Sequence, residues 1–193
     1  MIIGVSGISC SGKSTVSEYL ARAMSCKVIS LDDYYHLERC AVTRVQIDGR
    51  DVGDWDNPHV IDWDSFIHDI KAEKSRPLIV EGFLLCFSEP IMDLIDRLIT
   101  IEFSRDDYQI ALKRRIYRGF HEDVPPDYME DPFRTRVTYE CRYFHDFVWK
   151  RGFDHPEYTH PPETWRKPVL VLKSTDPIEI NNERSASFCL NLK

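Results

Sequence analysis

A short glycine-rich segment near the start of the chain constrains the fold more than any other feature. Residues 7–14 read Gly-Ile-Ser-Cys-Ser-Gly-Lys-Ser and match the pattern G-x-x-x-x-G-K-[ST] of a phosphate-binding loop. The apolar run Ile2–Val5 precedes this loop, and an amphipathic pattern follows it from Thr15 to Met24. Because the motif requires a strand before it and a helix after it, this context predicts a nucleotide-binding α/β domain.

The chemistry of the loop explains why these residue types occur together. Glycines let the backbone wrap around a phosphate, so that several N–H groups and the start of the next helix point at it. Lys13 is expected to reach the phosphoryl group that moves, and Ser14 to hold Mg²⁺, so ATP and Mg²⁺ are the expected cofactors. A chance glycine-rich turn is the alternative. The expected ATP contacts here are Gly7, Ser9, Cys10, Ser11, Gly12, Lys13, Ser14 and Thr15.

Four further apolar runs have the length and composition of buried strands. Helical patterns separate them, notably at Asp62–Ala72 and Asp107–Arg118. Alternating strands and helices favour an α/β fold of the P-loop NTPase type, with a parallel five-stranded sheet and helices on both faces. Ligands of such sheets bind at the carboxyl ends of the strands. The four runs are Lys27–Leu31, Pro77–Val80, Leu98–Ile101 and Pro168–Leu172.

Composition restricts the class of protein. A length of 193 residues with 42% hydrophobic content predicts a single domain over residues 1–193, and we expect a monomer. The formal net charge of -7 argues against a nucleic-acid or membrane-surface partner. Met1 runs directly into the first apolar run, so no leader and a cytoplasmic or nuclear location are expected. The histidines, such as His160, lack zinc-ligand spacing and are expected in surface loops rather than at a metal.

Four segments differ from the regular alternation of strands and helices. Residues 36–57 lack strong periodicity and are expected to form a mobile loop. Residues 177–193 show little helical apolar pattern, and residues 145–165 are irregular and receive no predicted role. Residues 113–133 combine a basic helix with a proline-rich, aromatic stretch and are expected to form a small lid over the site.

Two carboxylates follow predicted strands on the side of the phosphate loop. Asp32 is placed to act as the general base that takes a proton from an acceptor hydroxyl. Glu81 is placed to order Mg²⁺ through water. The alternatives are a helix cap or Asx turn at Asp32-Asp33, and a turn carboxylate at Glu81.

Four cations gather within the predicted helix that ends at Arg118. Their mutual repulsion favours a lid that clamps phosphate, although a charge run of this kind is equally consistent with a solvated face. The four residues are Lys113, Arg114, Arg115 and Arg118.

With these residues assembled, the chain resembles the nicotinamide riboside kinases, a branch of the uridine kinase and phosphoribulokinase group of P-loop kinases. The resemblance covers Ile2 to about Thr175. One departure concerns residues 177–193, because the family closes its fold with an amphipathic helix after the final strand. The landmarks are Gly7–Thr15, Val28–Tyr35, Trp55-Asp56, Leu78–Leu85, Lys113–Arg115 with Arg118, and Pro125–Asp127.

The resemblance implies roles for particular residues. Asp32 and Lys13 would be catalytic, and Ser14, Asp32 and Glu81 would surround Mg²⁺. Arg114 and Arg118 would contact the ATP phosphates, and Ser174 and Thr175 would lie beside adenine. Asp56 and Arg115 would hold the ribose hydroxyls, and Trp55 and Phe120 would face the pyridine ring. The implied substrate contacts are Asp32, Tyr34, Tyr35, Trp55, Asp56, Arg115 and Phe120.

The activity that the resemblance implies is transfer of the γ-phosphate of ATP to the 5′-hydroxyl of nicotinamide riboside, or of nicotinic acid riboside. The product would be the mononucleotide, a step of NAD biosynthesis. A uridine or cytidine kinase is the main alternative within the same class. From a different class, a P-loop nucleotide-binding switch without catalysis would hydrolyse nucleotide slowly and bind no small-molecule acceptor.

Overall fold

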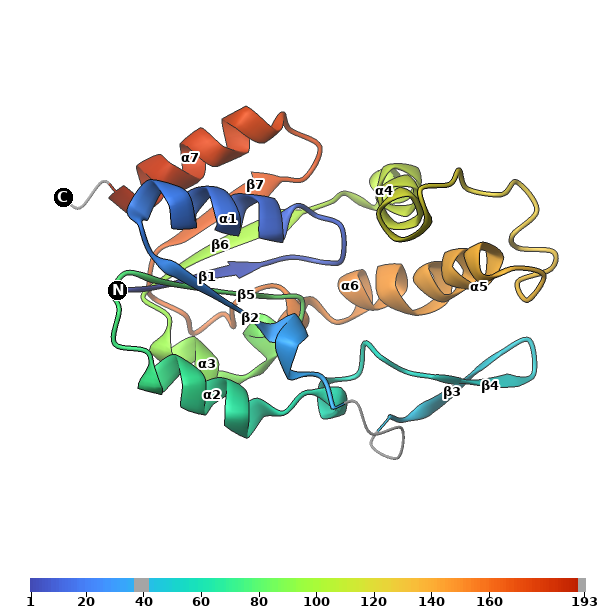
Figure 1. The fold of residues 1–193 in the computed structure, drawn as a ribbon, viewed down its shortest axis with the longest axis horizontal. Coiled ribbons are helices and arrows are strands. Elements are labelled where there is room, and N and C mark those ends of the chain that lie inside the picture. Colours follow the sequence, from blue (N-terminus) through green and yellow to red (C-terminus); the bar gives the residue numbers. More distant parts are fainter. Residues whose placement is uncertain (37–41, 191–193) are drawn as a thin grey trace.

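The central sheet has the topology that the apolar runs predict. The computed structural model describes residues 1–36 and 42–190 (Figure 1). Its five-stranded sheet is parallel and has the order β2-β5-β1-β6-β7. Every residue of β1 and β5 is buried, as expected for strands covered on both faces. The strands are β1 (Ile2–Ser6), β2 (Lys27–Ser30), β5 (Leu78–Gly82), β6 (Arg97–Glu102) and β7 (Val169–Lys173).

Helices cover both faces of this sheet, which confirms the predicted fold class. Figure 1 shows α1 (Lys13–Met24) and α7 (Ile178–Leu190) on one face, and α2 (Trp63–Ala72) and α3 (Glu89–Leu94) on the other. The core is correspondingly divided into two apolar clusters, one on each side of the sheet. No helix within residues 1–36 and 42–190 combines the length and apolar character needed to cross a membrane.

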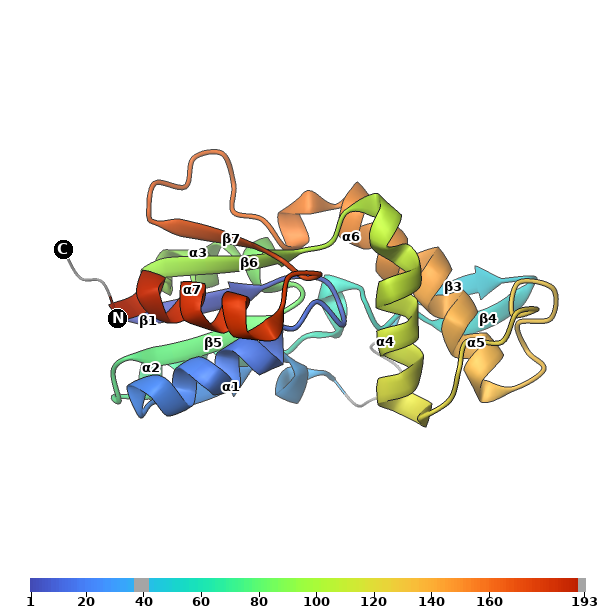
Figure 2. The ribbon, with the colours of Figure 1, turned by 90° about the horizontal axis from the view of Figure 1, so that it is seen from above.

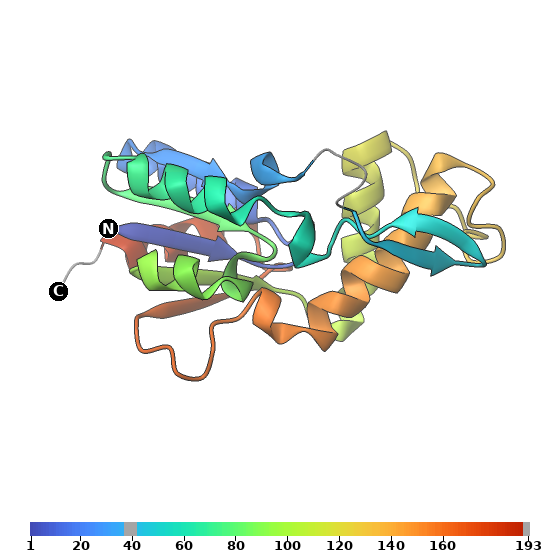
Figure 3. The same ribbon diagram turned by 90° about the horizontal axis from the view of Figure 1, so that it is seen from below.

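A second group of elements extends beyond the carboxyl ends of the strands. Figures 2 and 3 show α4 (Tyr108–Phe120) lying across the strand direction, with α5 (Arg136–Tyr143) and a hairpin farther out. The hairpin joins β3 (Arg44–Ile47) to β4 (Arg50–Gly53). A π-helical stretch, Phe144–Trp149, continues α5 into α6 (Lys150–Asp154). Short 3-10 helices span Leu31–Tyr34, Pro58–Val60, Leu85–Phe87, Arg105–Asp107 and Pro156–Tyr158.

The loop expected at residues 36–57 is wrong for residues 44–53. Residues 44–53 form the antiparallel hairpin β3–β4, while residues 37–41 lie outside the described part of the chain. The turn consists of Asp48 and Gly49, whose φ values are 45° and 77°. Positive φ at both central residues is the requirement of a type I′ hairpin turn, which Asp-Gly satisfies well.

The C-terminal segment also differs from its expectation, because Ile178–Leu190 is helical. The buried face of α7 consists of Asn181, Ser185 and Cys189, which are small or polar and therefore give no apolar stripe. Asn181 Nδ2 donates to the carbonyl of Lys173 at 2.8 Å, which ties the helix to the end of β7. The fold is thus closed by a helix after the last strand, and residues 191–193 lie outside the described range.

The stretch without a predicted role, residues 145–165, contains the end of the π-helix, α6 and the 3-10 helix at Pro156. Trp149 is nearly buried, and its ring lies 5.7 Å from that of Phe103 and 5.5 Å from that of Tyr108. Phe103 follows β6 directly. The stretch therefore anchors the outer elements to the end of the sheet.

Candidate active site

The phosphate loop connects β1 to α1 with the backbone conformation that its glycines permit. Gly7 has φ 152°, and a Cβ built there would lie 2.4 Å from the carbonyl oxygen of Ile101. Gly12 has φ 104° and is the N-cap of α1. Glycine is required at Gly7 for space and at Gly12 for conformation. The start of α1 consequently faces the cavity that the loop encloses.

The loop forms one wall of a cavity of about 450 Å³, which we call the nucleotide cavity. Most of the predicted ATP contacts line it. Gly7 lines neither this cavity nor its neighbour, and Ser9 lines the neighbouring cavity instead. Thr175 lies between two lining residues, Ser174 and Asp176, without lining the cavity itself. The predicted residues that do line it are Cys10, Ser11, Gly12, Lys13, Ser14, Thr15, Arg114, Arg118 and Ser174.

The far wall of this cavity comes from α4, α7 and the turn that follows β7. The Arg114 guanidinium donates to Ser174 Oγ at 2.8 Å, and Ser174 Oγ donates to the carbonyl of Ser11 at 2.7 Å. This chain of bonds holds the end of β7 against the phosphate loop. Ile178 and Asn181 complete the wall from α7 and were not predicted from the sequence, because the helix that presents them was not recognised.

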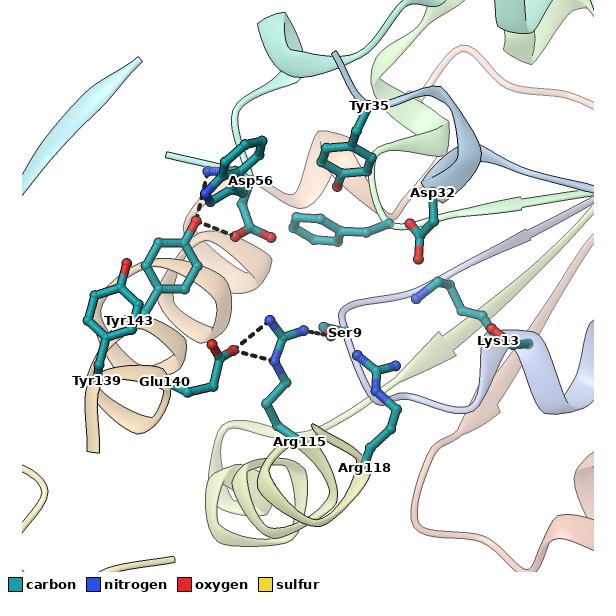
Figure 4. A pocket seen from close by; sticks show the side chains of 13 residues that line it. Ser9, Lys13, Asp32, Tyr35, Asp56, Arg115, Arg118, Tyr139, Glu140 and Tyr143 are labelled. Atoms are coloured by element: carbon teal, nitrogen blue, oxygen red, sulfur yellow. Dashed lines mark hydrogen bonds and ion pairs between the residues drawn. The ribbon is translucent and has the colours of Figure 1, made fainter. Parts of the chain in front are cut away.

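A second cavity, of about 500 Å³, adjoins the first (Figure 4). Lys13, Ser14 and Arg118 line both cavities. The two spaces therefore meet at the position where the phosphate loop would present the last phosphate of a nucleotide. We call this second space the acceptor cavity. Its other lining residues are Ser9, Asp32, Tyr35, Trp55, Asp56, Phe83, Arg115, Tyr139, Glu140 and Tyr143.

Asp32 lies at the junction of the two cavities. Its carboxylate faces the Lys13 side chain in Figure 4. Ser30, not Asp32, caps the 3-10 helix, because its Oγ accepts a hydrogen bond from the Asp32 backbone N–H at 3.4 Å. Burial lowers the pKa of Lys13, while Glu81 and Asp32 oppose that shift. The Asp32 carboxylate is thus free of a capping role and available to the cavity.

Glu81 is buried at the end of β5, with 6% of its surface exposed. Ser14 Oγ lies 3.2 Å from both of its carboxylate oxygens, and Ser30 Oγ donates to it at 3.1 Å. The set contributed by Ser14, Asp32 and Glu81 is entirely oxygen, which is the donor type that Mg²⁺ prefers. These three residues therefore fit a magnesium site of the kind that the phosphate-loop motif predicts.

Asp56 is held by Tyr143, a residue that the sequence did not single out. Tyr143 OH donates to Asp56 Oδ2 at 2.8 Å and accepts from the Trp55 backbone N–H at 2.9 Å. Burial raises the pKa of Asp56, while the Tyr143 hydrogen bond and the nearby Arg115 charge act in the opposite direction. A half-buried carboxylate with one fixed donor has acceptor capacity left for a bound hydroxyl.

A buried ion pair supports this wall from behind. Asp54 is 1% exposed, and Arg151 donates to both of its carboxylate oxygens, with Nη2 at 2.7 Å from Oδ2. Arg151 comes from α6 and Asp54 follows the hairpin. The pair therefore joins two parts of the chain whose contact no sequence pattern predicts.

Arg115 lies between the phosphate loop and α5. Its Nη1 donates to Ser9 Oγ at 2.9 Å, and its Nε donates to Glu140 Oε1 at 2.7 Å. Burial alone would lower the pKa of Arg115, but the Glu140 carboxylate outweighs that effect and raises it. The guanidinium is fixed in orientation by these two partners and faces the acceptor cavity (Figure 4).

Two of the predicted substrate contacts lie outside the acceptor cavity. Tyr34 OH donates to Asp69 Oδ2 at 2.7 Å, and the Tyr34 ring packs at 4.9 Å from that of Phe66 on α2. Phe120 lines a separate cavity of about 230 Å³ beside Glu140. Trp55 and Phe120 therefore do not face the same space, and the aromatic partners of Trp55 in the acceptor cavity are tyrosines and Phe83.

Comparison with curated proteins finds relatives among small-molecule kinases. The chain is 25% identical over 147 residues to human nicotinamide riboside kinase 2, covering 65% of this chain. It is 24% identical over 196 residues to uridine kinase of Schizosaccharomyces pombe, covering 79% of this chain. The matches span 61% and 41%, respectively, of the length of these relatives. No family model matches the chain.

Solved structures extend the likeness over the whole chain. A gluconokinase from Sinorhizobium meliloti 1021 matches 98% of this chain with a TM-score of 0.52 and 16% identity, and the match covers 91% of that chain. A sugar kinase from Janibacter sp. HTCC2649 matches 99% with a TM-score of 0.54 and 13% identity, covering 95% of that chain. The chain has the P-loop kinase fold. The relatives and solved structures named here are kinases, and their likeness to this chain shows its fold.

Proposed function

We propose that this protein transfers the γ-phosphate of ATP to the 5′-hydroxyl of a nucleoside, with nicotinamide riboside as the favoured acceptor. The observation that carries the proposal is the junction of two cavities at Lys13, Ser14 and Arg118. One cavity is enclosed by the phosphate loop, and the other has the mixed polar and aromatic walls of a nucleoside site. Such an arrangement brings a donor phosphate and an acceptor hydroxyl together.

The proposed reaction is an in-line displacement at the γ-phosphorus. Asp32 accepts the proton of the 5′-hydroxyl as its oxygen bonds to phosphorus, and the bond from phosphorus to the ADP oxygen breaks. Lys13 and Arg118 neutralise charge on the transferring group. Ser14, Asp32 and Glu81 would hold Mg²⁺, which would supply positive charge to offset the negative charge of the phosphates.

The acceptor cavity supports a nucleoside in two ways. Its volume of about 500 Å³ lies within the range of small-molecule sites. Asp56, fixed by Tyr143, offers an acceptor to sugar hydroxyls, and Trp55 offers an aromatic face to the base. A cationic pyridinium against such a face gains about 0.5–2 kcal/mol that a neutral pyrimidine does not. This difference is the reason for favouring nicotinamide riboside over uridine.

A uridine kinase is the second candidate, because the match to the yeast uridine kinase covers 79% of this chain. Both candidate activities would use the same ATP site, the same general base, Asp32, and the same contacts to the ribose. They differ in the nucleobase that packs against the aromatic wall. The acceptor cavity argues against a non-catalytic nucleotide switch, because a switch would bind no small-molecule acceptor there.

A phosphotransfer assay across a panel of nucleosides with Mg-ATP tests the proposal. We expect nicotinamide riboside to give the highest kcat/KM, with measurable uridine activity. Asp32→Asn should lower kcat by about 10²–10⁴-fold while leaving ATP binding nearly unchanged, because it keeps the side-chain shape and removes the base.

Asp33→Asn is the matched control, since Asp33 is exposed and lines neither cavity. Equal activity of the Asp32 and Asp33 variants would exclude Asp32 as the base. Failure of every nucleoside to accept phosphate would exclude the proposed function.

A further inference from the structure

The acceptor cavity contains a carboxylate whose role the proposed reaction leaves open. Glu140 comes from α5 and lines both the acceptor cavity and the small cavity beside Phe120. Its side chain is 20% exposed, and it lies 2.6 Å from Nη2 of Arg115. Neither transfer of the phosphoryl group nor removal of the proton requires it.

At the outer end of the acceptor cavity, around Glu140, there are more carboxyl groups than cations. Figure 4 shows the Glu140 carboxylate bonded to the Arg115 guanidinium, and it shows the Asp56 carboxylate at the same end of the cavity, away from Lys13. Lys13 and Arg118 also line the nucleotide cavity, where ATP phosphates would neutralise them. Within residues 1–36 and 42–190, Arg115 is then the remaining cation that lines the acceptor cavity.

The tyrosines of this end do not supply compensating charge. Burial raises the pKa of Tyr35 and of Tyr143, so both stay neutral at physiological pH and act only as hydrogen-bonding groups. Arg151, the next cation along the wall, is already paired with Asp54. Among the described residues, Arg115 is thus shared by Glu140 and Asp56, and this end of the acceptor cavity has no spare cation for a substrate carboxylate.

We propose that Glu140 sets the charge preference of the acceptor cavity, so that nucleosides whose base lacks an anionic group are admitted and those whose base has a carboxylate are rejected. This inference rests on the proposed nucleoside kinase activity. It makes Glu140 a specificity-determining residue and predicts that, of the two pyridine nucleosides considered above, the carboxamide is the substrate.

Arg115 cannot remove the discrimination by turning to an incoming carboxylate. It uses Nε and Nη2 on Glu140 and Nη1 on Ser9. If Arg115 turned away, Glu140 would be left unpaired, partly buried and close to the carboxylate of the substrate. Like charges in such a setting repel strongly enough to change affinity by about tenfold or more.

Two matched pairs of nucleosides test the inference. The first is nicotinamide riboside with nicotinic acid riboside, and the second is 5-carbamoyluridine with 5-carboxyuridine. Each pair shares its ring and ribose, so effects on transfer or on sugar binding cancel in the amide-to-acid ratio of kcat/KM. In the wild type we expect a ratio of about tenfold or more in both pairs.

Glu140→Gln should bring this ratio close to one, because it removes the charge and frees Arg115 for a substrate carboxylate. Glu140→Asp keeps the charge and should retain the preference. Glu183→Gln is the control, since it makes the same charge change on an exposed position of α7. An unchanged ratio in Glu140→Gln, or an equal drop in Glu183→Gln, would overturn the inference.

Calorimetric binding of the same four nucleosides separates this inference from the proposed activity. Amide-selective binding that Glu140→Gln abolishes, together with no phosphoryl transfer, would support the charge preference and exclude the kinase reaction. If the wild type transferred phosphate equally well to amide and acid nucleosides, the kinase reaction would be supported and the charge preference excluded. If none of the four nucleosides binds, both proposals are excluded.

Discussion

The inner wall of the nucleotide cavity is a continuous stretch of chain, residues 10–16, whereas the acceptor cavity is lined by side chains scattered between Ser9 and Tyr143. The first wall follows from local backbone geometry, namely glycine conformations and the start of a helix. The second depends on contacts between distant elements, such as the Arg151 pair with Asp54. Local geometry tolerates change elsewhere in the molecule, but assembled geometry fails when any one support is removed.

The largest expected effect is on the nucleotide side. Lys13→Ala should lower kcat by at least about 10²–10³-fold, because it removes a charge that would stabilise the transferring phosphoryl group. The loop itself should persist, since Gly7 and Gly12 determine its backbone. Steady-state kinetics with Mg-ATP and a thermal melt measure the two effects separately.

Lys71→Ala, an exposed lysine on α2, is the control for that experiment. A Lys13→Ala enzyme that turns over normally would remove the interpretation of this loop as the phosphate site. A large loss of stability in the same variant would break the contrast between local and assembled geometry.

The next effect is on the stability of the acceptor side. Arg151→Met should lower the free energy of unfolding by about 3 kcal/mol, because it leaves the Asp54 carboxylate buried without its cation. Urea denaturation measures the loss. The neighbouring Lys150→Met, at an exposed position of α6, should change stability by less than about 0.5 kcal/mol.

Adding Asp54→Asn to Arg151→Met should recover part of the loss, since no unpaired charge is then buried. Equal stability of the Arg151 and Lys150 variants would show that the acceptor side does not depend on this pair.

A smaller effect concerns the choice of base. Trp55→Leu should weaken nicotinamide riboside relative to uridine by a few-fold to about thirtyfold, since a cation against an aromatic face gains about 0.5–2 kcal/mol. Phe120→Leu is the matched control, because Phe120 lines the adjoining small cavity instead. Values of kcat/KM for both nucleosides decide between the two aromatic residues. A larger change of the nicotinamide riboside to uridine ratio in Phe120→Leu than in Trp55→Leu would show that Phe120 faces the pyridine ring, as the resemblance implies.

The smallest effect concerns the pH dependence of stability. His160 Nε2 lies 2.9 Å from Glu102 Oε1, and this hydrogen bond raises the pKa of His160 above 6.5 despite partial burial. The same bond lowers the pKa of Glu102 below 4.5. The pair therefore stabilises the fold fully between about pH 5 and pH 6.5. The stabilisation is lost as pH rises through the raised pKa of His160, or falls through the lowered pKa of Glu102.

His160→Gln should remove less than about 1 kcal/mol in that window, because the pair is partly exposed. The difference from the wild type should disappear at higher pH. Denaturation at several pH values measures it, with His68→Gln on the exposed side of α2 as control. A difference that is constant with pH would show that the pair does not titrate as described.

The sheet, α1 and the phosphate loop could be predicted from the sequence because each is encoded locally. β1, β5 and β6 are continuous apolar runs, and a parallel sheet covered on both faces is where such runs belong. Asp32 and Glu81 were predicted because they directly follow apolar runs in the sequence, and the carboxyl ends of parallel strands meet at one edge.

α7 and the acceptor wall could not be predicted in the same way. The buried face of α7 is small and polar, so periodicity of apolar residues is the wrong signal there. Tyr143 and Glu140 lie beside a π-helical stretch, Phe144–Trp149, which changes the angle per residue and shifts the face that a regular helix would present. The aromatic residues were visible in the sequence, but the direction in which they point was not.

The hydrogen bond from Ser174 to Ser11 joins positions 163 residues apart. A nascent chain that has exposed only its first hundred or so residues contains the phosphate loop but lacks the opposite wall. Pairing across so long a separation is slow compared with local helix formation. A nucleotide that needs both walls would therefore bind late during synthesis, and its arrival would select chains whose final strand has already joined the sheet.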